Sequence, residues 1–292
     1  TVEAYQRIAE LGPDVAHQEV VDHLVSVDVN RFPLHLTSLN VASQNVRETT
    51  EAIHAYHASF FDLDPRTDPL VSSRLSGSDE RVGELGTFDA VVGNPPYIRQ
   101  ENLPPDTEHF REHLGAFGRP DRTTYYDGSK RLSEKSDAYV YFVTQAARFL
   151  REGGRLGYIV PTKWMMTDYG RSFQQFLFDQ FKVEAVVGFG VRAFEDALVD
   201  TALLLLERCE DPDERASTVT KFVRVTEPME VEHIVDTIEY DEEIPPGDDM
   251  VIETRPDHRT VALQQSDVEA IESGKLGHFL SVPGDIIQLV EH

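Results

Sequence analysis

Apolar and polar positions along the chain predict alternating strands and helices. Short apolar runs are typical of buried strands, and apolar residues three or four positions apart are typical of helices. We predict strands over 24–27, 53–61, 88–92, 156–160, 183–189, 201–207 and 218–226. We predict helices over 1–10, 14–23, 32–46, 134–152, 169–181 and 266–275. This alternation indicates an α/β protein.

Some segments need a more specific interpretation. In the helix over 32–46 we expect Leu36, Leu39 and Val41 on the apolar side, and we expect the helix over 134–152 to stop at Gly153-Gly154. The strands over 183–189 and 201–207 could form an antiparallel edge pair. Four segments lack periodicity and are expected to be loops or connectors: 64–86, 98–133, 210–217 and 239–249.

Residues 88–97 combine a strand with a rigid loop. The run Phe88 to Val92 lies between Gly86 and Gly93 and has the pattern of a buried strand in a parallel sheet. Two consecutive prolines after Asn94 fix φ, remove two backbone donors and restrict the residues before them. Ligands of open α/β sheets lie beyond the carboxyl ends of strands, so this loop is the expected site.

The loop residues suggest a ligand. The amide oxygen of Asn94 and a neighbouring carbonyl can accept both hydrogens of an exocyclic amine. The ring of Tyr97 can stack on a flat heterocycle. These groups fit an amino-bearing base, although a Pro-Pro pair can also simply end a strand in a turn.

Composition limits the possible classes. The chain has 292 residues, 40% of them hydrophobic, which allows one large core or one domain with a small appendage. It has neither an apolar run long enough for a membrane helix nor a signal peptide, so we expect a soluble, cytoplasmic protein without membrane contacts. Cys209 is the single cysteine, which excludes a disulfide framework. His109 and His113 lack the glutamate of a zinc-protease helix, and no metal is expected.

The net charge of −25 argues against nucleic acid at first sight. However, six lysines stand against 21 arginines, and acidic residues are spread along the whole chain. This pattern suggests a salt-loving, haloarchaeal-like source. In molar salt the Debye length falls to about 3 Å, so diffuse acidity would not repel DNA and local basic clusters would matter more.

The sequence Phe-Asp-Ala-Val-Val-Gly-Asn-Pro-Pro-Tyr over 88–97 resembles motif IV of the amino-methyltransferases. It is most similar to the N6-adenine DNA methyltransferases of restriction-modification systems. The resemblance implies a Rossmann-like class I methyltransferase sheet with helices on both faces, S-adenosyl-L-methionine as cofactor and double-stranded DNA as partner. It also implies that a flipped adenine is held by the catalytic residues Asn94, Pro95, Pro96 and Tyr97.

Cofactor contacts are expected near two strand ends. Asp28 follows the strand over 24–27, where an acid of Rossmann-like folds binds ribose hydroxyls, and it matches the acidic residue of the family. An Asx turn or a helix cap is the alternative for Asp28. Family members usually carry an acid followed by an aromatic after the next strand. Here Ser59 precedes Phe60 and Asp62 follows, which leaves open which side chain binds the cofactor amine.

DNA contacts are expected from basic residues interleaved with aromatic ones in the long irregular stretch. The candidates are Arg119, Arg122, Lys130, Arg131 and Lys135, with Lys163 after a later strand. A solvated loop explains the stretch equally well. The resemblance makes Phe194 a second ring against the target base, with core packing as the alternative. Asp137 can contact the site or interact with the dipole of its helix.

We predict a methyltransferase catalytic domain over 1–210, a linker with accessory strands over 211–265 and the start of a target-recognition region over 266–292. Gly12 is the only glycine before Asp28. We therefore expect the first strand and the glycine-rich loop of the family to be missing from this stretch, and further domains to belong to the same polypeptide.

Three other functions remain open. A protein glutamine methyltransferase would use the same Asn-Pro-Pro-Tyr motif, because a carboxamide presents the same two hydrogens. A non-catalytic DNA-binding fragment is compatible with the absent glycine loop. A nucleotide-binding oxidoreductase is the weakest alternative, because the sequence has no GxGxxG motif.

Overall fold

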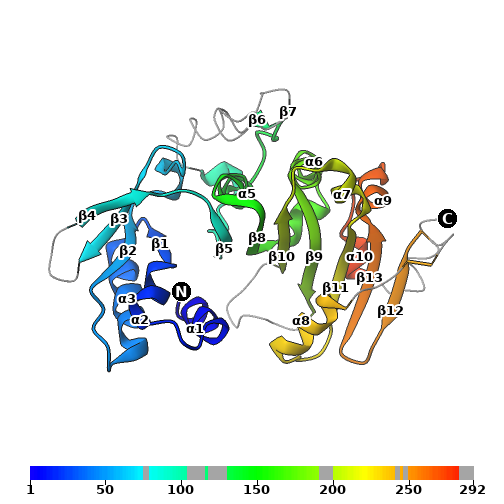
Figure 1. Ribbon diagram of the computed structural model, residues 1–292. Coiled ribbons are helices and arrows are strands. Elements are labelled where there is room, and N and C mark those ends of the chain that lie inside the picture. Colours follow the sequence, from blue (N-terminus) through cyan, green and yellow to red (C-terminus); the bar gives the residue numbers. More distant parts are fainter. Residues whose placement is uncertain are drawn as a thin grey trace. The chain divides into compact units, whose positions relative to one another are not determined.

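The computed structural model describes residues 1–74, 79–103, 116–117, 130–190, 200–240, 244–245 and 249–282. The chain forms two compact units, unit 1 over Thr1–Thr87 and unit 2 over Phe88–His292 (Figure 1). Each unit has a β-sheet of its own.

Unit 1 contains a four-stranded sheet in the order β1-β2-β3-β4. Its strands are β1 Val25–Asp28, β2 Ala52–His57, β3 Pro69–Arg74 and β4 Asp79–Glu84. As predicted, the first two are strands, and they pair in parallel. The loop prediction for 64–86 was wrong, because β3 and β4 pair antiparallel there. Many strand positions in that segment are polar or charged, and this hid the pattern.

The helices of unit 1 are α1 Val2–Leu11, α2 His17–Asp22 and α3 Arg31–Ala42, with the short turns η1 Ser43–Asn45 and η2 Phe60–Asp62. The core consists of Tyr5, Val20, Val21, Val41 and Ile53. The expected face of α3 was partly wrong, because Leu36 and Leu39 are 43% and 62% exposed. Val41 is buried as predicted, together with Leu34, and their spacing of seven residues places them on one helix face.

Unit 2 contains a seven-stranded sheet in the order β12-β13-β11-β9-β10-β8-β5. The strands are β5 Phe88–Gly93, β8 Leu150–Pro161, β9 Phe181–Phe189, β10 Thr201–Arg208, β11 Val219–Val225, β12 Val251–Thr254 and β13 His258–Gln264. The pairs β5–β8 and β9–β11 are parallel, whereas the other pairs are antiparallel. A separate pair joins β6 Ala116–Phe117 to β7 Lys130–Arg131.

The helices of unit 2 are α5 Ala138–Arg148, α6 Gly170–Gln180, α7 Pro212–Ser217, α8 Val231–Glu239, α9 Gln265–Ala270 and α10 His278–Ser281 (Figure 1). Two short turns, η3 Gln100–Asn102 and η5 Thr162–Met165, follow strand ends. The helices that we predicted over 134–152, 169–181 and 266–275 are present, each shorter than its sequence pattern. The segment 210–217, which we expected to be a linker, contains α7. Asp211 caps this helix by accepting hydrogen bonds from the amides of Asp213 and Glu214.

The Gly153-Gly154 pair does not end the helix as expected. Helix α5 ends at Arg148, and β8 begins two residues later. The pairing with β5 then shifts from Phe88↔Leu150 to Ala90↔Arg155, so the glycines lie in a bulge. Gly153 has φ of +71°, and a Cβ on Gly154 would lie 2.9 Å from the Phe88 carbonyl oxygen. Both positions therefore need glycine for the shape of the bulge.

Two expectations about the sheet need correction. β9 and β10 do pair antiparallel, but they lie between β11 and β8 and are not an edge pair. β5 is parallel to β8 as predicted, yet it has a single neighbour strand among the described residues and is not buried. Val92 in β5 is 68% exposed.

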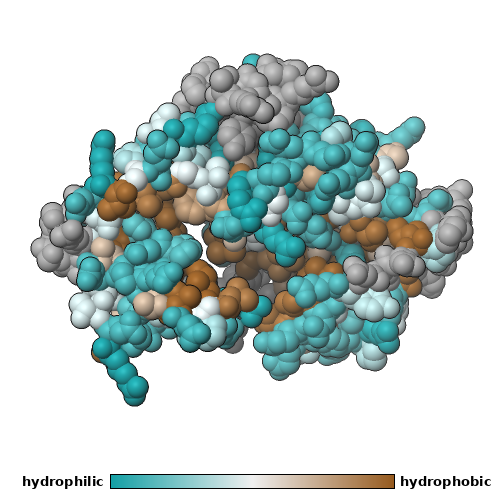
Figure 2. Space-filling model, in the orientation of Figure 1, coloured by the Kyte–Doolittle hydropathy of each residue, from teal (hydrophilic) through white to brown (hydrophobic). Residues whose placement is uncertain are grey.

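The visible surface is mostly hydrophilic, as the charge of the chain suggests, and carries scattered hydrophobic areas (Figure 2). Within the described part of the chain, none of the helices has the length and apolar character needed to cross a bilayer.

Candidate active site

The Asn-Pro-Pro-Tyr segment begins where β5 ends. The last two residues of β5 pair with β8, as Val92↔Gly157 and Gly93↔Tyr158. A Cβ on Gly93 would lie 3.0 Å from Cε1 of Tyr158, so the strand passes close to that ring. Asn94 therefore stands directly beyond the carboxyl end of a parallel strand, where α/β sheets bind their ligands.

A hydrogen bond orients the side chain of Asn94. The hydroxyl of Tyr97 donates to Oδ1 of Asn94 over 2.8 Å, and the carbonyl of Ile159 in β8 lies 3.4 Å from the same hydroxyl. Asn94 is exposed while Pro95 is buried. An amide oxygen has two lone pairs, so Oδ1 keeps one for a ligand. Burial raises the pKa of Tyr97, which keeps its hydroxyl a donor at neutral pH.

Asp137 fixes the chain that follows Tyr97. Its Oδ1 accepts a hydrogen bond from the backbone amide of Gln100 over 2.9 Å. The next residue, Ala138, donates its amide to the carbonyl of Ile98 over 2.9 Å. Asp137 is the N-cap residue of α5 and is 6% exposed. Asp137 thus stands at the helix start, one of the two positions considered from the sequence, and its side chain holds the loop without capping the helix.

The second carboxylate oxygen of Asp137 contacts a pair of tyrosines. The hydroxyl of Tyr169 donates to Oδ2 over 3.1 Å, and the hydroxyl of Tyr139 lies 3.0 Å from that of Tyr169. Burial raises the pKa of Tyr169 to about 12. The sequence pointed to neither tyrosine, because each sits in or beside a helix whose pattern indicated only packing.

Lys163 also faces this group. Its Nζ lies 3.7 Å from Oδ2 of Asp137 and 5.5 Å from the centre of the Tyr169 ring. Its side chain is 50% exposed, so it keeps contact with solvent. Trp164 is buried and packs edge-on against Phe173, with ring centroids 5.3 Å apart. Trp164 is therefore a packing residue.

The other residues expected to contact DNA differ in their partners and exposure. Lys130 forms an ion pair with Asp179 of α6. Arg131 and Lys135 are exposed. Arg119, Arg122 and Phe194 lie outside the described residues.

In unit 1, the residues expected to bind cofactor gather at one end of the sheet. Asp28 ends β1, and its pairing with His57 of β2 brings the residues after β2 alongside. The amide of Ala58 donates to the backbone carbonyl of Asp28 over 3.2 Å. The parallel register thus brings Asp28 near the segment that contains Ser59, Phe60 and Asp62.

The side chains at this end have local partners too. Oδ1 of Asp28 accepts the amide of Asn30 over 2.7 Å, which is the Asx turn considered from the sequence. Ser59 caps η2 by accepting the amide of Phe61 over 3.4 Å. Phe60 is half-buried and Asp62 is exposed. The second oxygen of the Asp28 carboxylate also has lone pairs that can accept hydrogen bonds from hydroxyl groups.

The chain is similar to known proteins in both sequence and fold. The family model of the Eco57I restriction-modification methylase matches residues 22–194. The chain is 35% identical over 174 residues to the type II methyltransferase M.BstVI of Geobacillus stearothermophilus, covering 58% of this chain and 27% of that protein. It is 30% identical over 218 residues to M.XhoI of Xanthomonas vasicola, covering 68% of this chain and 37% of that protein. These relatives lend no support to the expected haloarchaeal source.

Solved structures share the fold. The methyltransferase subunit of a type I restriction-modification system from Streptococcus thermophilus superposes with a TM-score of 0.57 at 14% identity, over 88% of this chain and 48% of that one. The type IIG restriction endonuclease BpuSI gives a TM-score of 0.57 at 12% identity, over 90% and 26%. The predicted class I methyltransferase fold is therefore confirmed. The chain spans about half or less of each of these proteins.

Proposed function

Because this chain belongs to the Eco57I restriction-modification methylase family, we propose that it methylates the exocyclic amine of adenine in double-stranded DNA, with S-adenosyl-L-methionine as the methyl donor. The observation that carries the proposal is the hydrogen bond from Tyr97 to Asn94, which orients an exposed amide oxygen beyond the end of β5. A restriction-modification system is the setting that the family suggests.

The chemistry at Asn94 suits an amine that is a weak nucleophile. The lone pair of the adenine amine is delocalised into the ring. Hydrogen bonds from its two hydrogens to Oδ1 of Asn94 and to the Pro95 carbonyl would localise that lone pair and aim it at the methyl group. The hydroxyl of Tyr97 occupies one lone pair of Oδ1, and the other remains for the amine.

Base flipping is part of the proposal. An adenine inside a duplex must leave the stack, which costs a few kcal/mol. Stacking on aromatic rings can offset part of that cost. Tyr97 and Phe194 are the rings that we assign to this role. For the backbone of the DNA we assign Arg119, Arg122, Lys130, Arg131, Lys135 and Lys163.

For the cofactor we assign the end of the sheet in unit 1. Asp28 would bind the ribose hydroxyls, and Phe60 would pack against the adenine ring of the cofactor. Ser59 and Asp62 are the candidates for its amine. The fit rests on a carboxylate and a half-buried ring at neighbouring ends of two parallel strands. When bound, the sulfonium supplies an electrophilic methyl group.

A methyl-transfer assay tests the proposal. The chain would be incubated with tritiated cofactor and unmethylated duplex DNA of high sequence complexity, so that an unknown recognition site is present. Nucleoside chromatography would then show whether N6-methyladenine forms. We expect label in adenine, and we expect Asn94→Ala to lower the rate by about 100-fold or more.

Asn40→Ala is the matched control, because Asn40 is an exposed asparagine in α3 of unit 1. Its rate should equal that of the wild type. Label in cytosine, or in a translation factor and not in DNA, would contradict the proposal. Absence of label from every nucleobase would contradict it for this chain.

A further inference from the structure

Three side chains of unit 2 meet far along the sheet from Asn94. His233 belongs to α8, Asp257 to the turn between β12 and β13, and His258 to the start of β13. In the sheet order, β11, β9, β10 and β8 separate β13 from β5. The cluster is therefore separate from the candidate active site.

The carboxylate of Asp257 lies between the two imidazoles. Nδ1 of His258 is 2.9 Å from Oδ1, and Nδ1 of His233 is 3.6 Å from Oδ2. One ligand atom from each of the three residues lies within 4.8 Å of the others. The two rings are nearly perpendicular, with centroids 5.7 Å apart, so they approach the carboxylate from different directions.

The backbone holds two of the three residues firmly. The carbonyl of Asp257 accepts the amides of Thr226 and Glu227 over 2.7 and 3.2 Å. His258 is buried, with 4% of its surface exposed. His233 is different, because its side chain is 54% exposed and can move. The cluster thus has a rigid pair and one adjustable member.

From this geometry we propose that His233, Asp257 and His258 bind a divalent late first-row transition metal ion such as Zn²⁺. Two imidazoles and one carboxylate are ligands that zinc prefers, and they leave a position for water. Calcium and magnesium prefer sites made only of oxygen atoms. A zinc ion about 2.1 Å from each ligand places tetrahedral ligand atoms roughly 3.4 Å apart. Rotation of the exposed His233 side chain can bring its nitrogen to that distance, and a small turn of the partly exposed Asp257 carboxylate can lengthen its 2.9 Å contact with His258.

The ion would join α8 to the β12–β13 turn. Helix α8 packs on the sheet through Ile234 and Ile238, which contact the cluster that contains Val223 and Val225. Metal bonds at His233 would add a second attachment near the start of the helix. Because such an ion binds the folded state, it should stabilise unit 2 by mass action. This site could not be predicted from the sequence, because the ligands come from separate elements that show no metal-binding motif.

Titration calorimetry with zinc sulfate on the whole chain, stripped with a chelator beforehand, tests the proposal. We expect saturable binding of one ion per chain, removed by His233→Ala or weakened at least about tenfold. His233→Ala is the main variant because its exposed side chain contributes little to packing. Asp257→Asn, which keeps the side-chain shape, should weaken binding as well.

His35→Ala is the matched control, because it removes an exposed histidine from a helix of unit 1. Its zinc affinity should match the wild type. At 100 times the dissociation constant, zinc should raise Tm of the wild type by about 5 to 10 °C and leave that of His233→Ala unchanged. Cobalt chloride should produce visible absorption bands in the wild type that His233→Ala lacks.

Two results would overturn the proposal. One is the absence of saturable zinc binding to the wild type. The other is equal zinc affinity in the wild type and His233→Ala, since the ion would then lie elsewhere. Because the ligands lie apart from Asn94, failure of this site would leave the methyl-transfer assay unaffected.

Discussion

At the residue scale, a single carboxylate connects the candidate site to the fold. Asp137 accepts one hydrogen bond from the backbone after Tyr97 and another from Tyr169. It is buried, and a buried charge requires such partners. Asp137 acts through the loop, so it is a positioning residue.

Tyr169→Phe tests this role. The variant removes one donor from Asp137 and should lower the free energy of unfolding by about 0.5–1.5 kcal/mol. If methyl transfer is observed, we expect kcat to fall with little change in the affinity for cofactor, because the loop after Asn94 would be held less firmly. The measurements are urea denaturation and steady-state kinetics. Tyr240→Phe, at a tyrosine that is 67% exposed, is the control and should change neither quantity.

The same variant has a defined pH dependence. Burial raises the pKa of Tyr169 to about 12, above the ordinary value of 10.0. A group whose pKa is raised on folding stabilises the folded state fully below its unfolded pKa and loses that contribution as pH rises through the folded pKa. The difference between the wild type and Tyr169→Phe should therefore stay constant from pH 7 to 9 and shrink above pH 10. A difference that is already falling between pH 7 and 9 would contradict this account of Tyr169.

At the element scale, the sequence predicted the elements whose apolar residues form a short run or follow the helical period. The strand before Asn94 was found because its residues form a short apolar run between two glycines, and the helix that contains Ala138 and Ala146 was found because its apolar residues recur every three or four positions. The strands β3 and β4 were missed because their positions are largely polar. The bulge at Gly153 was missed for another reason: two adjacent glycines predict a helix end as readily as a bulge.

For the site, too, the sequence indicated what lies in a local pattern and missed what tertiary structure brings together. Asn94 and Tyr97 could be named as candidates because the motif is contiguous in sequence. Asp137 was considered as a possible site contact, but its hydrogen bonds to the loop and to Tyr169 depend on tertiary structure that the local pattern does not show. The cluster around His233 was missed for the same reason.

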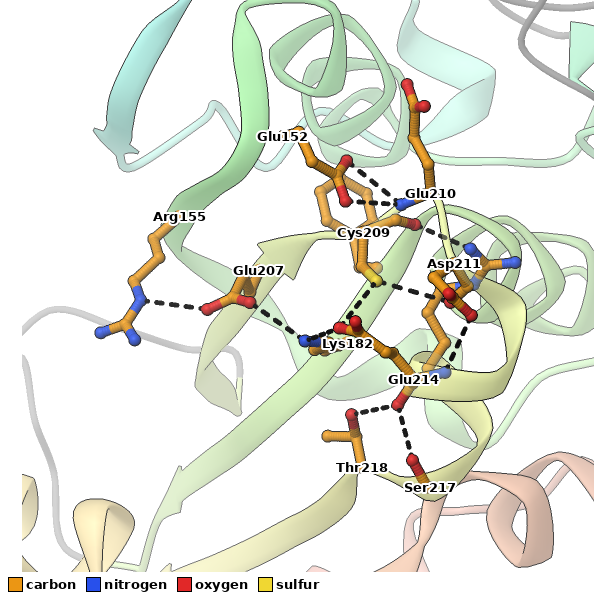
Figure 3. A network of polar contacts seen from close by, with 12 residues as sticks. Glu152, Arg155, Lys182, Glu207, Cys209, Glu210, Asp211, Glu214, Ser217 and Thr218 are labelled. Carbon is orange, nitrogen blue, oxygen red and sulfur yellow. Dashed lines mark hydrogen bonds and ion pairs between the residues drawn. The ribbon is translucent and has the colours of Figure 1, made fainter.

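An ion-pair network attaches α7 to the sheet (Figure 3). Nζ of Lys182 in β9 lies 2.6 Å from Glu214 of α7 and 3.4 Å from Glu207 of β10. The hydrogen bond that Lys182 donates to Glu214 raises the pKa of Lys182, so the charge persists throughout the neutral range. Arg155 of β8 contacts the other oxygen of Glu207 over 3.5 Å. Three strands and a helix therefore share one set of charges.

Lys182→Met should lower the free energy of unfolding by about 1–3 kcal/mol, because it leaves the mostly buried Glu207 with a weaker set of partners. Urea denaturation at pH 7 is the measurement. Lys275→Met is the matched control, because the carboxylate that pairs with Lys275 belongs to Asp168 and is 97% exposed. Exposed pairs contribute about 0–1 kcal/mol. Equal losses in the two variants would show that the network adds nothing beyond a surface pair.

At the scale of the whole molecule, charge is the dominant property. The net charge is −25, and 52 acidic residues stand against 27 lysines and arginines. Such an excess destabilises the compact state through self-repulsion. The Debye length falls from about 10 Å at 0.1 M salt to about 3 Å at 1 M. Potassium chloride should therefore stabilise the fold by screening acidic residues from one another.

We expect Tm at pH 7 to rise by about 5 °C between 0.1 and 1 M potassium chloride, which corresponds to roughly 3 kcal/mol for a chain of this size. Salt also strengthens apolar burial, independently of charge, so the comparison must separate the two effects. The sequence pI of about 4.7 provides the control, because repulsion is small near that pH. Circular dichroism at both pH values is the measurement. If the rise in Tm is as large near pH 4.7 as at pH 7, self-repulsion is not its cause, and the acidity of this chain does not limit its stability.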